Sequence, residues 1–105
     1  MQRIDPVFKA KWTEALRSGK YKQFLEALRS PELDSYCCLG VACDIYDPDK
    51  WNTKQPWVYD YSAVKLPIWL LEKINLSPRD QSELMQMNDL GKTFDEIAGW
   101  IEQNL

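Results

Sequence analysis

The chain has 105 residues, of which 45% are hydrophobic and 28% are charged, a length and balance typical of one globular domain. Its net charge of −3 argues against a nucleic-acid partner, and its 12% aromatic residues argue against disorder. The sequence contains no histidine, which excludes Ser-His-Asp triads, Cys-His dyads and histidine-ligated metal sites.

No apolar run reaches the roughly 18 residues of a membrane-spanning helix, and residues 1–6 lack the apolar core of a signal peptide. We therefore expect one helical domain over residues 1–105, in the cytoplasm and without a membrane partner. Charge is uneven along it. Residues 1–35 carry seven Lys and Arg against five Asp and Glu, whereas residues 36–105 carry six against eleven.

The first predicted helix covers residues 6–18. Asp5 before Pro6 is typical of a helix start, and Gly19 is typical of a left-handed helix end. Between them, apolar residues recur at helical spacing: Phe8, Trp12, Ala15 and Leu16. Residues 24–28 then predict a short amphipathic turn or helix, which Ser30-Pro31 interrupts.

Residues 36–46 are apolar almost all round, which favours a buried central helix over a strand. Asp34 or Ser35 is its expected cap. Residues 47–65 form a long connection rich in proline and aromatic residues, with a small hairpin or strand near 57–61 as one alternative.

Three further helices are predicted in the second half of the chain. The first begins with Pro67 and ends at Asn75. The second starts at the Ser77-Pro78 cap and continues to about residue 88, and the last covers 94–104 behind a Thr93–Glu96 capping box. The expected fold is mainly α, with four to five helices and one long aromatic-rich loop.

Three cysteines, Cys37, Cys38 and Cys43, lie within seven residues. An odd, clustered set does not build a disulfide framework, and no further ligands complete a metal site. We expect small buried core residues in a reducing compartment, with a reactive thiol as the alternative. The nearby Asp44 needs a partner in this apolar stretch, and Arg17 is the expected one.

Three segments offer side chains for binding. Residues 17–23 place cations around a glycine turn that would grip a phosphate or an acidic partner, unless they form only a solvated helix end. Asn88-Asp89 either ends a helix or faces a ligand. The loop aromatics either stack on a ligand ring or cover the core as a lid. The predicted binding residues are Arg17, Lys20, Tyr21, Lys22, Gln23, Trp57, Tyr59, Asn88 and Asp89.

Residues 12–23, 36–44 and 87–98 resemble the opening, the central Cys-Cys-Leu-Gly-Val motif and the closing turn and helix of small accessory proteins of tailed bacteriophages and prophages. Phe24-Leu25-Glu26 departs from the more polar or glycine-containing sequence that this resemblance implies. The resemblance implies no catalytic residue. By analogy, it favours a protein that binds and blocks a host factor or sequesters a signalling molecule.

The sequence therefore supports three hypotheses. The first is a non-enzymatic phage protein that counters host defence, by sequestering a small anionic, nucleotide-like ligand or by occluding a host protein, with ligand sequestration slightly preferred. The second is a structural or regulatory oligomer that associates through Leu84, Met85 and Met87 beside Trp100. The third is a small enzyme that uses a cysteine or Asp44. No cofactor, metal or catalytic residue is predicted.

Overall fold

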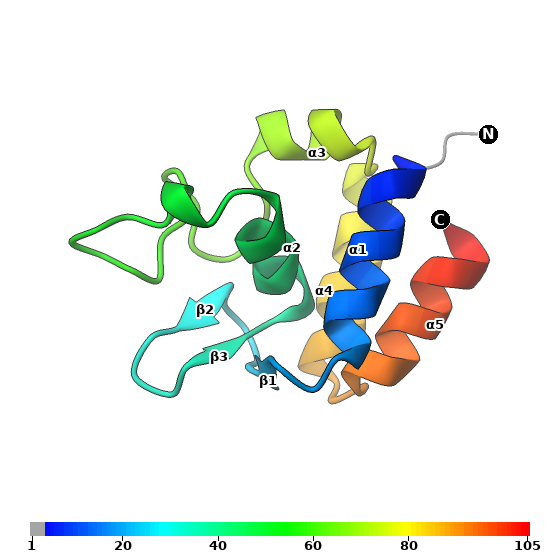
Figure 1. Ribbon diagram of the computed structural model, residues 1–105, viewed down its shortest axis with the longest axis horizontal. Coiled ribbons are helices and arrows are strands. Elements are labelled where there is room, and N and C mark those ends of the chain that lie inside the picture. The colour runs from blue at the N-terminus through cyan, green and yellow to red at the C-terminus, as the bar shows by residue number, and fades with distance from the viewer. Residues whose placement is uncertain (1–3) are drawn as a thin grey trace.

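The computed structural model describes residues 4–105 (Figure 1). They contain five α-helices, one short 3₁₀ helix and a small three-stranded sheet. Residues 1–3 lie outside the described residues; they belong to the segment 1–6 that lacks the apolar core of a signal peptide. The elements in chain order are α1 (Pro6–Arg17), β1 (Lys22–Gln23), β2 (Arg29–Ser30), β3 (Ser35–Tyr36), α2 (Cys38–Tyr46), η1 (Pro48–Lys50), α3 (Ile68–Ile74), α4 (Pro78–Asp89) and α5 (Phe94–Asn104).

The mainly α prediction is confirmed, and the local signals that carried it are visible at the helix ends. The Asp5 carboxylate accepts a hydrogen bond from the Phe8 amide, and the Ser77 hydroxyl accepts one from the Asp80 amide. Thr93 and Glu96 form the complete capping box. Each of these contacts satisfies a backbone donor that a helix leaves free in its first turn.

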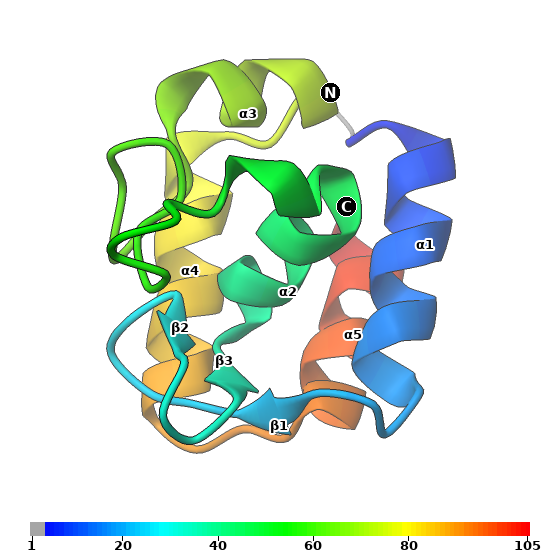
Figure 2. The same ribbon diagram turned by 60° about the vertical axis from the view of Figure 1, so that its left-hand side comes forward.

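Helix α2 lies at the centre of the molecule. It packs against α1 and α4, while α5 packs against both of those helices (Figures 1 and 2). Its residues Cys38–Cys43 are all buried, as expected for a helix that is apolar all round. The Trp12 indole on α1, itself fully buried, donates to the Cys38 carbonyl oxygen at 3.0 Å and ties the two helices together.

The segment between α1 and α2 differs from the prediction. Residues 24–28 form neither a helix nor a helical turn, because their backbone donors bond to distant partners: Phe24 to Tyr36 and Leu28 to Ala63. Strand β3 pairs in parallel with β1 and antiparallel with β2. Glu26 adopts φ +70°, a conformation that favours glycine.

Two predicted helix starts also shift. The cap of α2 is Cys37, whose sulfur accepts from the Gly40 amide at 3.3 Å, and not Asp34 or Ser35. Ser35 is instead part of β3, so α2 begins at Cys38. Pro67 is the cap of α3 and precedes its first helical residue.

The long connection of residues 47–65 seats two of its aromatic side chains, Trp51 and Tyr59, against the core. It makes single-residue bridges between Trp51 and Tyr59 and between Tyr59 and Ser62, in place of a regular hairpin. The Arg29 guanidinium lies over the rings of Tyr36 and Trp51, at 5.3 and 5.1 Å from their centroids. It also donates to the Pro56 carbonyl oxygen and so fastens the connection to β2.

Ring contacts run without a break through eight side chains. Their centroid separations lie between 5.0 and 6.4 Å, within the usual range for interacting aromatic pairs. In contact order they are Trp12, Phe8, Tyr46, Trp69, Tyr59, Trp51, Tyr36 and Tyr21. Among the helices of residues 4–105, none combines the length and apolarity that crossing a bilayer requires.

Candidate functional site

The residues predicted to bind a ligand do not converge on one pocket. Residues 17–22 lie at the end of α1 and on β1, whereas Trp57 belongs to the connection on the opposite side of the molecule in both views (Figures 1 and 2). The hollows that contain Arg17, Lys20 and Tyr21 do not contain Trp57 or Tyr59.

Gln23, Asn88 and Asp89 belong to an internal hydrogen-bond network. The Asn88 side chain is 1% exposed, and its oxygen accepts from the Gln23 amide at 3.0 Å and from the Cys38 backbone amide at 3.2 Å. Its nitrogen donates to the Phe24 carbonyl oxygen at 2.8 Å. These bonds occupy both ends of its amide, so Asn88 connects α4 to α2 and to the sheet.

The other two members of the network support the same connection. The Gln23 amide also donates to the Lys92 carbonyl oxygen at 2.6 Å. Asp89 accepts from the Glu26 backbone amide at 2.8 Å, where the chain takes its left-handed turn. Both residues therefore hold the segment between α1 and α2 against the end of α4.

Asp44 has partners other than the expected Arg17. Its two carboxylate oxygens accept from the Tyr21 hydroxyl at 2.7 Å and from the Trp51 indole at 3.1 Å. Burial and the adjacent Asp44 carboxylate raise the pKa of Tyr21 well above its usual range. The phenol therefore stays protonated and donates, so Tyr21 fixes β1 to α2.

The two predicted loop aromatics have different surroundings. Tyr59 is fully buried, and its hydroxyl donates to the Asp47 carbonyl oxygen, so it covers the core and does not offer a ring to a ligand. Trp57 is 44% exposed.

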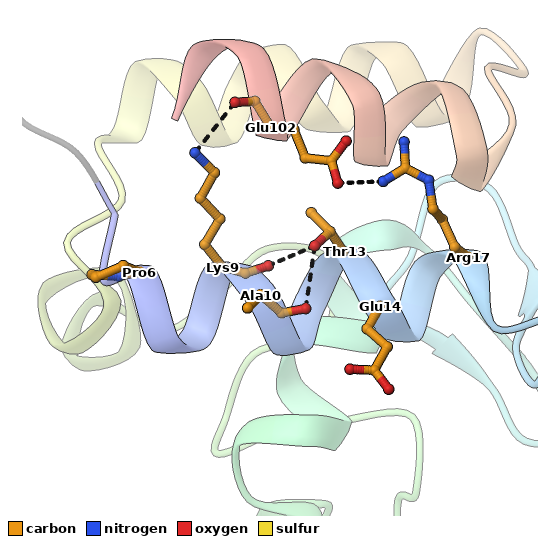
Figure 3. Close-up of a pocket in the computed structure, with 7 residues that line it drawn as sticks. All are labelled: Pro6, Lys9, Ala10, Thr13, Glu14, Arg17 and Glu102. Atoms are coloured by element: carbon orange, nitrogen blue, oxygen red, sulfur yellow. Dashed lines mark hydrogen bonds and ion pairs between the residues drawn. The ribbon is translucent and has the colours of Figure 1, made fainter.

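Arg17 lines a hollow of about 410 Å³ between α1 and α5. Its guanidinium forms an ion pair with the carboxylate of Glu102, whose carbonyl oxygen also accepts from Lys9 (Figure 3). The Glu102 carboxylate already neutralises Arg17 in this hollow, so an anion would have to displace it.

A second hollow, of about 320 Å³, lies on the other side of α1 and contains two of the predicted residues, Lys20 and Tyr21. We call it the α1–α2 groove; its lining is Lys11, Glu14, Ala15, Ser18, Lys20, Tyr21 and Ile45. An adjoining hollow of about 210 Å³ shares Lys11 and Ile45 with it and extends towards the start of α1. Aliphatic carbon, a phenol ring, the Ser18 hydroxyl and the Glu14 carboxylate thus line the groove beside two exposed lysines.

The groove lies on the most basic part of an acidic chain. Residues 9–22 carry five Lys and Arg against one carboxylate, a net charge of +4, which leaves −7 for the rest of the sequence. Within residues 4–105, Arg17–Glu102 is the only ion pair closer than 4.0 Å, so Lys11 and Lys20 are not neutralised by a direct partner. Lys11 and Ile45 were not among the predicted binding residues, although the run of cations around Lys11 was visible in the sequence.

The three thiols are buried, as the favoured interpretation expected. Burial raises the pKa of Cys37 to about 11 and that of Cys38 and Cys43 well above the usual range. Thiolates are the nucleophilic form of cysteine, and this environment suppresses them. In the part of the chain that the structure describes, no three His, Cys, Asp or Glu side chains gather around a common metal position.

Residues 4–72 match the sequence model of a family described as "Domain of unknown function (DUF8296)". The matched segment contains the whole α1–α2 groove, but not α4 or α5. No curated protein and no solved structure matches the chain.

Proposed function

This chain belongs to the DUF8296 family, and from its surface we propose that it is a non-enzymatic binding protein that occludes an acidic segment of a partner protein in the α1–α2 groove. The observation that carries the proposal is the groove itself, an open hollow that sets Ala15 and Ile45 beside two lysines, with Glu14 as its one carboxylate. The partner segment would place an apolar side chain against Ala15 and Ile45, and carboxylates beside the lysines.

The shape of the surface favours a protein partner over a sequestered small molecule. Small ligands typically lose about 70–90% of their surface to an enclosing pocket, whereas the α1–α2 groove is open to solvent. The more enclosed hollow beside Cys37 and Asn88 measures about 10 Å³, which is about the space of one water molecule. Of the two mechanisms left open by the sequence, occlusion is therefore the better supported.

Electrostatics supports the choice of an acidic partner. Opposite charges across an interface raise the rate of association and select among partners more than they raise affinity. A groove of net positive charge on an otherwise acidic molecule orients such an encounter. The resemblance to phage accessory proteins makes a host defence protein, met in the host cytoplasm, the first partner to test.

The test measures the affinity of two charge-reversal double variants for the same partner protein. That partner is first captured from host cells with the unaltered chain and then purified. Lys11→Glu with Lys20→Glu should weaken binding at least about tenfold, equivalent to 1.4 kcal/mol, and should lessen its dependence on salt. Lys73→Glu with Arg79→Glu makes the same change in net charge on α3 and α4, and should leave affinity within about twofold.

Circular dichroism should give the same helix content for both double variants. Equal affinity of the two variants would contradict the proposal. A small molecule retained by the purified protein in native mass spectrometry, and lost in the groove variant, would instead favour sequestration.

A further inference from the structure

The turn between β2 and β3 presents an apolar side chain between two carboxylates. Residues 31–34 read Pro-Glu-Leu-Asp, and the Leu33 side chain is 60% exposed. Of the large apolar side chains that are exposed within residues 4–105, only Leu33 has an acidic residue on both sides. The chain therefore carries on its own surface the combination of groups that suits the α1–α2 groove.

The two carboxylates of the turn have no direct cationic partner. Arg17–Glu102 is the only ion pair closer than 4.0 Å in the part of the chain that the structure describes, so Glu32 and Asp34 are not neutralised by contact. The nearest cation in sequence, Arg29, is held over two aromatic rings. The turn is thus an acidic surface, and the groove lies on the most basic part of the same molecule.

The turn also has a defined shape. The Asp34 amide donates to the Pro31 carbonyl oxygen at 3.3 Å, and the Ser35 hydroxyl donates to the Leu33 carbonyl oxygen at 3.0 Å. Asp34 takes φ +49° at the point where the chain returns into β3, and the pairing of Ser30 with Ser35 closes the turn. A segment that is already ordered loses less conformational entropy when it binds.

The turn does not reach the groove of its own chain. It projects on the side of the molecule away from α1 in both views, whereas the groove lies between α1 and α2 (Figures 1 and 2). The strand order β1-β3-β2 likewise places β2 at the edge of the sheet away from β1, which follows α1. A turn of this kind that fills the groove therefore comes from a second copy of the chain.

We propose that the β2–β3 turn of a second copy inserts Leu33 into the α1–α2 groove, against Ala15 and Ile45. Glu32 and Asp34 of the turn then lie beside the two lysines of the groove. This inference rests on the proposed function, because it uses the same groove and the same recognition chemistry. Turn and groove are different surfaces, so each copy can offer its turn to one neighbour and its groove to another. Self-association thus competes with the partner protein for the groove.

The small size of this contact predicts a weak association. Stable interfaces involve about 20–30 residues on each side, whereas residues 31–34 are the whole of the turn. We expect a dissociation constant between about 10 µM and 1 mM. The groove is then free for a partner in dilute protein and filled by a second copy in concentrated protein.

The first step of the test is sedimentation equilibrium of the full chain over concentrations that span this range. The average mass should rise with concentration. Leu33→Ser should raise the dissociation constant at least about tenfold. Leu90→Ser is the matched control, since Leu90 is 75% exposed at the end of α4, and it should leave the constant unchanged.

The second step exchanges the charges of the two surfaces. Glu32→Lys with Asp34→Asn makes the turn basic, and asparagine tolerates the left-handed conformation of position 34. Lys11→Glu with Lys20→Glu makes the groove acidic. Each double variant alone should remain monomeric. An equal mixture of the two should associate, because the acidic turn of one variant then meets the basic groove of the other.

Affinity for the captured partner separates this inference from the proposed function. In dilute protein, Leu33→Ser should bind the partner as tightly as the unaltered chain does, because it leaves the groove intact. Partner binding in the groove without self-association would overturn this inference alone. Self-association of turn with groove, without a partner that binds the groove, would overturn the proposed function alone.

Three results contradict the contact between turn and groove. One is a chain that remains monomeric at every concentration. Another is association that persists in each double variant alone, which would place the contact on a different surface. The third is a mixture that does not associate although circular dichroism shows that both variants keep their helix content.

Discussion

Asn88 shows how one buried side chain joins segments that are far apart in sequence. Its amide bonds to residues 50, 64 and 65 positions away: Cys38, Phe24 and Gln23. Such a residue stabilises the fold mainly because its removal leaves buried donors and acceptors unpaired.

Asn88→Ala should lower the free energy of unfolding by about 3 kcal/mol, because it leaves the Cys38 amide and the Phe24 carbonyl unpaired. Urea denaturation followed by circular dichroism gives the value. Asn104→Ala removes an exposed asparagine that bonds within its own helix, and should change stability by less than about 0.5 kcal/mol. A loss at position 88 no larger than that at position 104 would contradict the structural role.

Residue-scale reasoning from the sequence was accurate where the deciding contact is local. The caps at Asp5, Ser77 and Thr93 each join residues three apart, and all three were predicted. Asn88 was ambiguous because its partners are set by the tertiary fold. Asp44 was assigned Arg17, since no local pattern reveals that Tyr21 and Trp51 approach it.

At the scale of elements, the close approach of α2 to the segment before β2 is the contact most sensitive to added volume. A Cβ atom on Gly40 would lie 1.8 Å from the Leu28 carbonyl oxygen, which also accepts from the Cys37 amide. The obstacle is backbone held by a hydrogen bond, so it cannot move aside as a flexible side chain would.

Gly40→Ala should therefore destabilise the protein by about 3 kcal/mol or more, through displacement of α2 or of the Leu28 backbone. Gly99→Ala is the matched control within α5, where the nearest atom to the new Cβ is the Arg17 guanidinium at 3.7 Å. It should stabilise by about 0.5–1 kcal/mol, because alanine favours the helix. Thermal unfolding of both variants tests the pair, and a Gly40→Ala protein as stable as Gly99→Ala would show that the approach is not close.

Helices were predicted better than strands, because the pattern that specifies a helix is local and the pairing that specifies a strand is not. A helix is specified by a periodic pattern within its own residues, as in α1 and α5. Strands β1, β2 and β3 have two residues each and exist through pairing between segments. The start of α2 was misplaced because a cysteine sulfur is an uncommon helix cap, and the polar residues just before it were the more typical choice.

At the scale of the whole molecule, the titrating groups give a one-sided dependence of stability on pH. Burial raises the pKa of three thiols and three phenols: Cys37, Cys38, Cys43, Tyr21, Tyr36 and Tyr59. The unfolded chain releases these protons at lower pH than the folded chain does. Each group therefore stabilises the fold fully below its unfolded pKa, and that contribution is lost as pH rises through its folded pKa.

We expect the urea midpoint to be constant between about pH 6 and 8, since the chain has no histidine to titrate there. Above about pH 8.5, where unfolded cysteine begins to ionise, the midpoint should fall, and it should continue to fall towards the Cys37 pKa of about 11. Measurements in reducing buffer exclude disulfide formation. A constant midpoint up to pH 10.5 would contradict burial of the thiols.

The candidate site was only partly predictable at this scale. The cations of residues 17–22 were recognised from the sequence, because charge and a glycine turn are local features. The position of Lys20 beside Ile45, and the separation of Trp57 from it, follow from how α1 and the 47–65 connection pack around α2. Those relations favoured occlusion of a protein over sequestration of a small ligand.

The unbroken series of ring contacts from Trp12 to Tyr21 also gives the molecule an optical property. Light absorbed by its tyrosines passes efficiently to tryptophans a few ångströms away, so the folded protein emits almost entirely as tryptophan. Trp51 and Trp69 link the 47–65 connection to the helices through this series. Intrinsic fluorescence and near-ultraviolet dichroism therefore report, without any added label, whether that connection is seated when a partner binds.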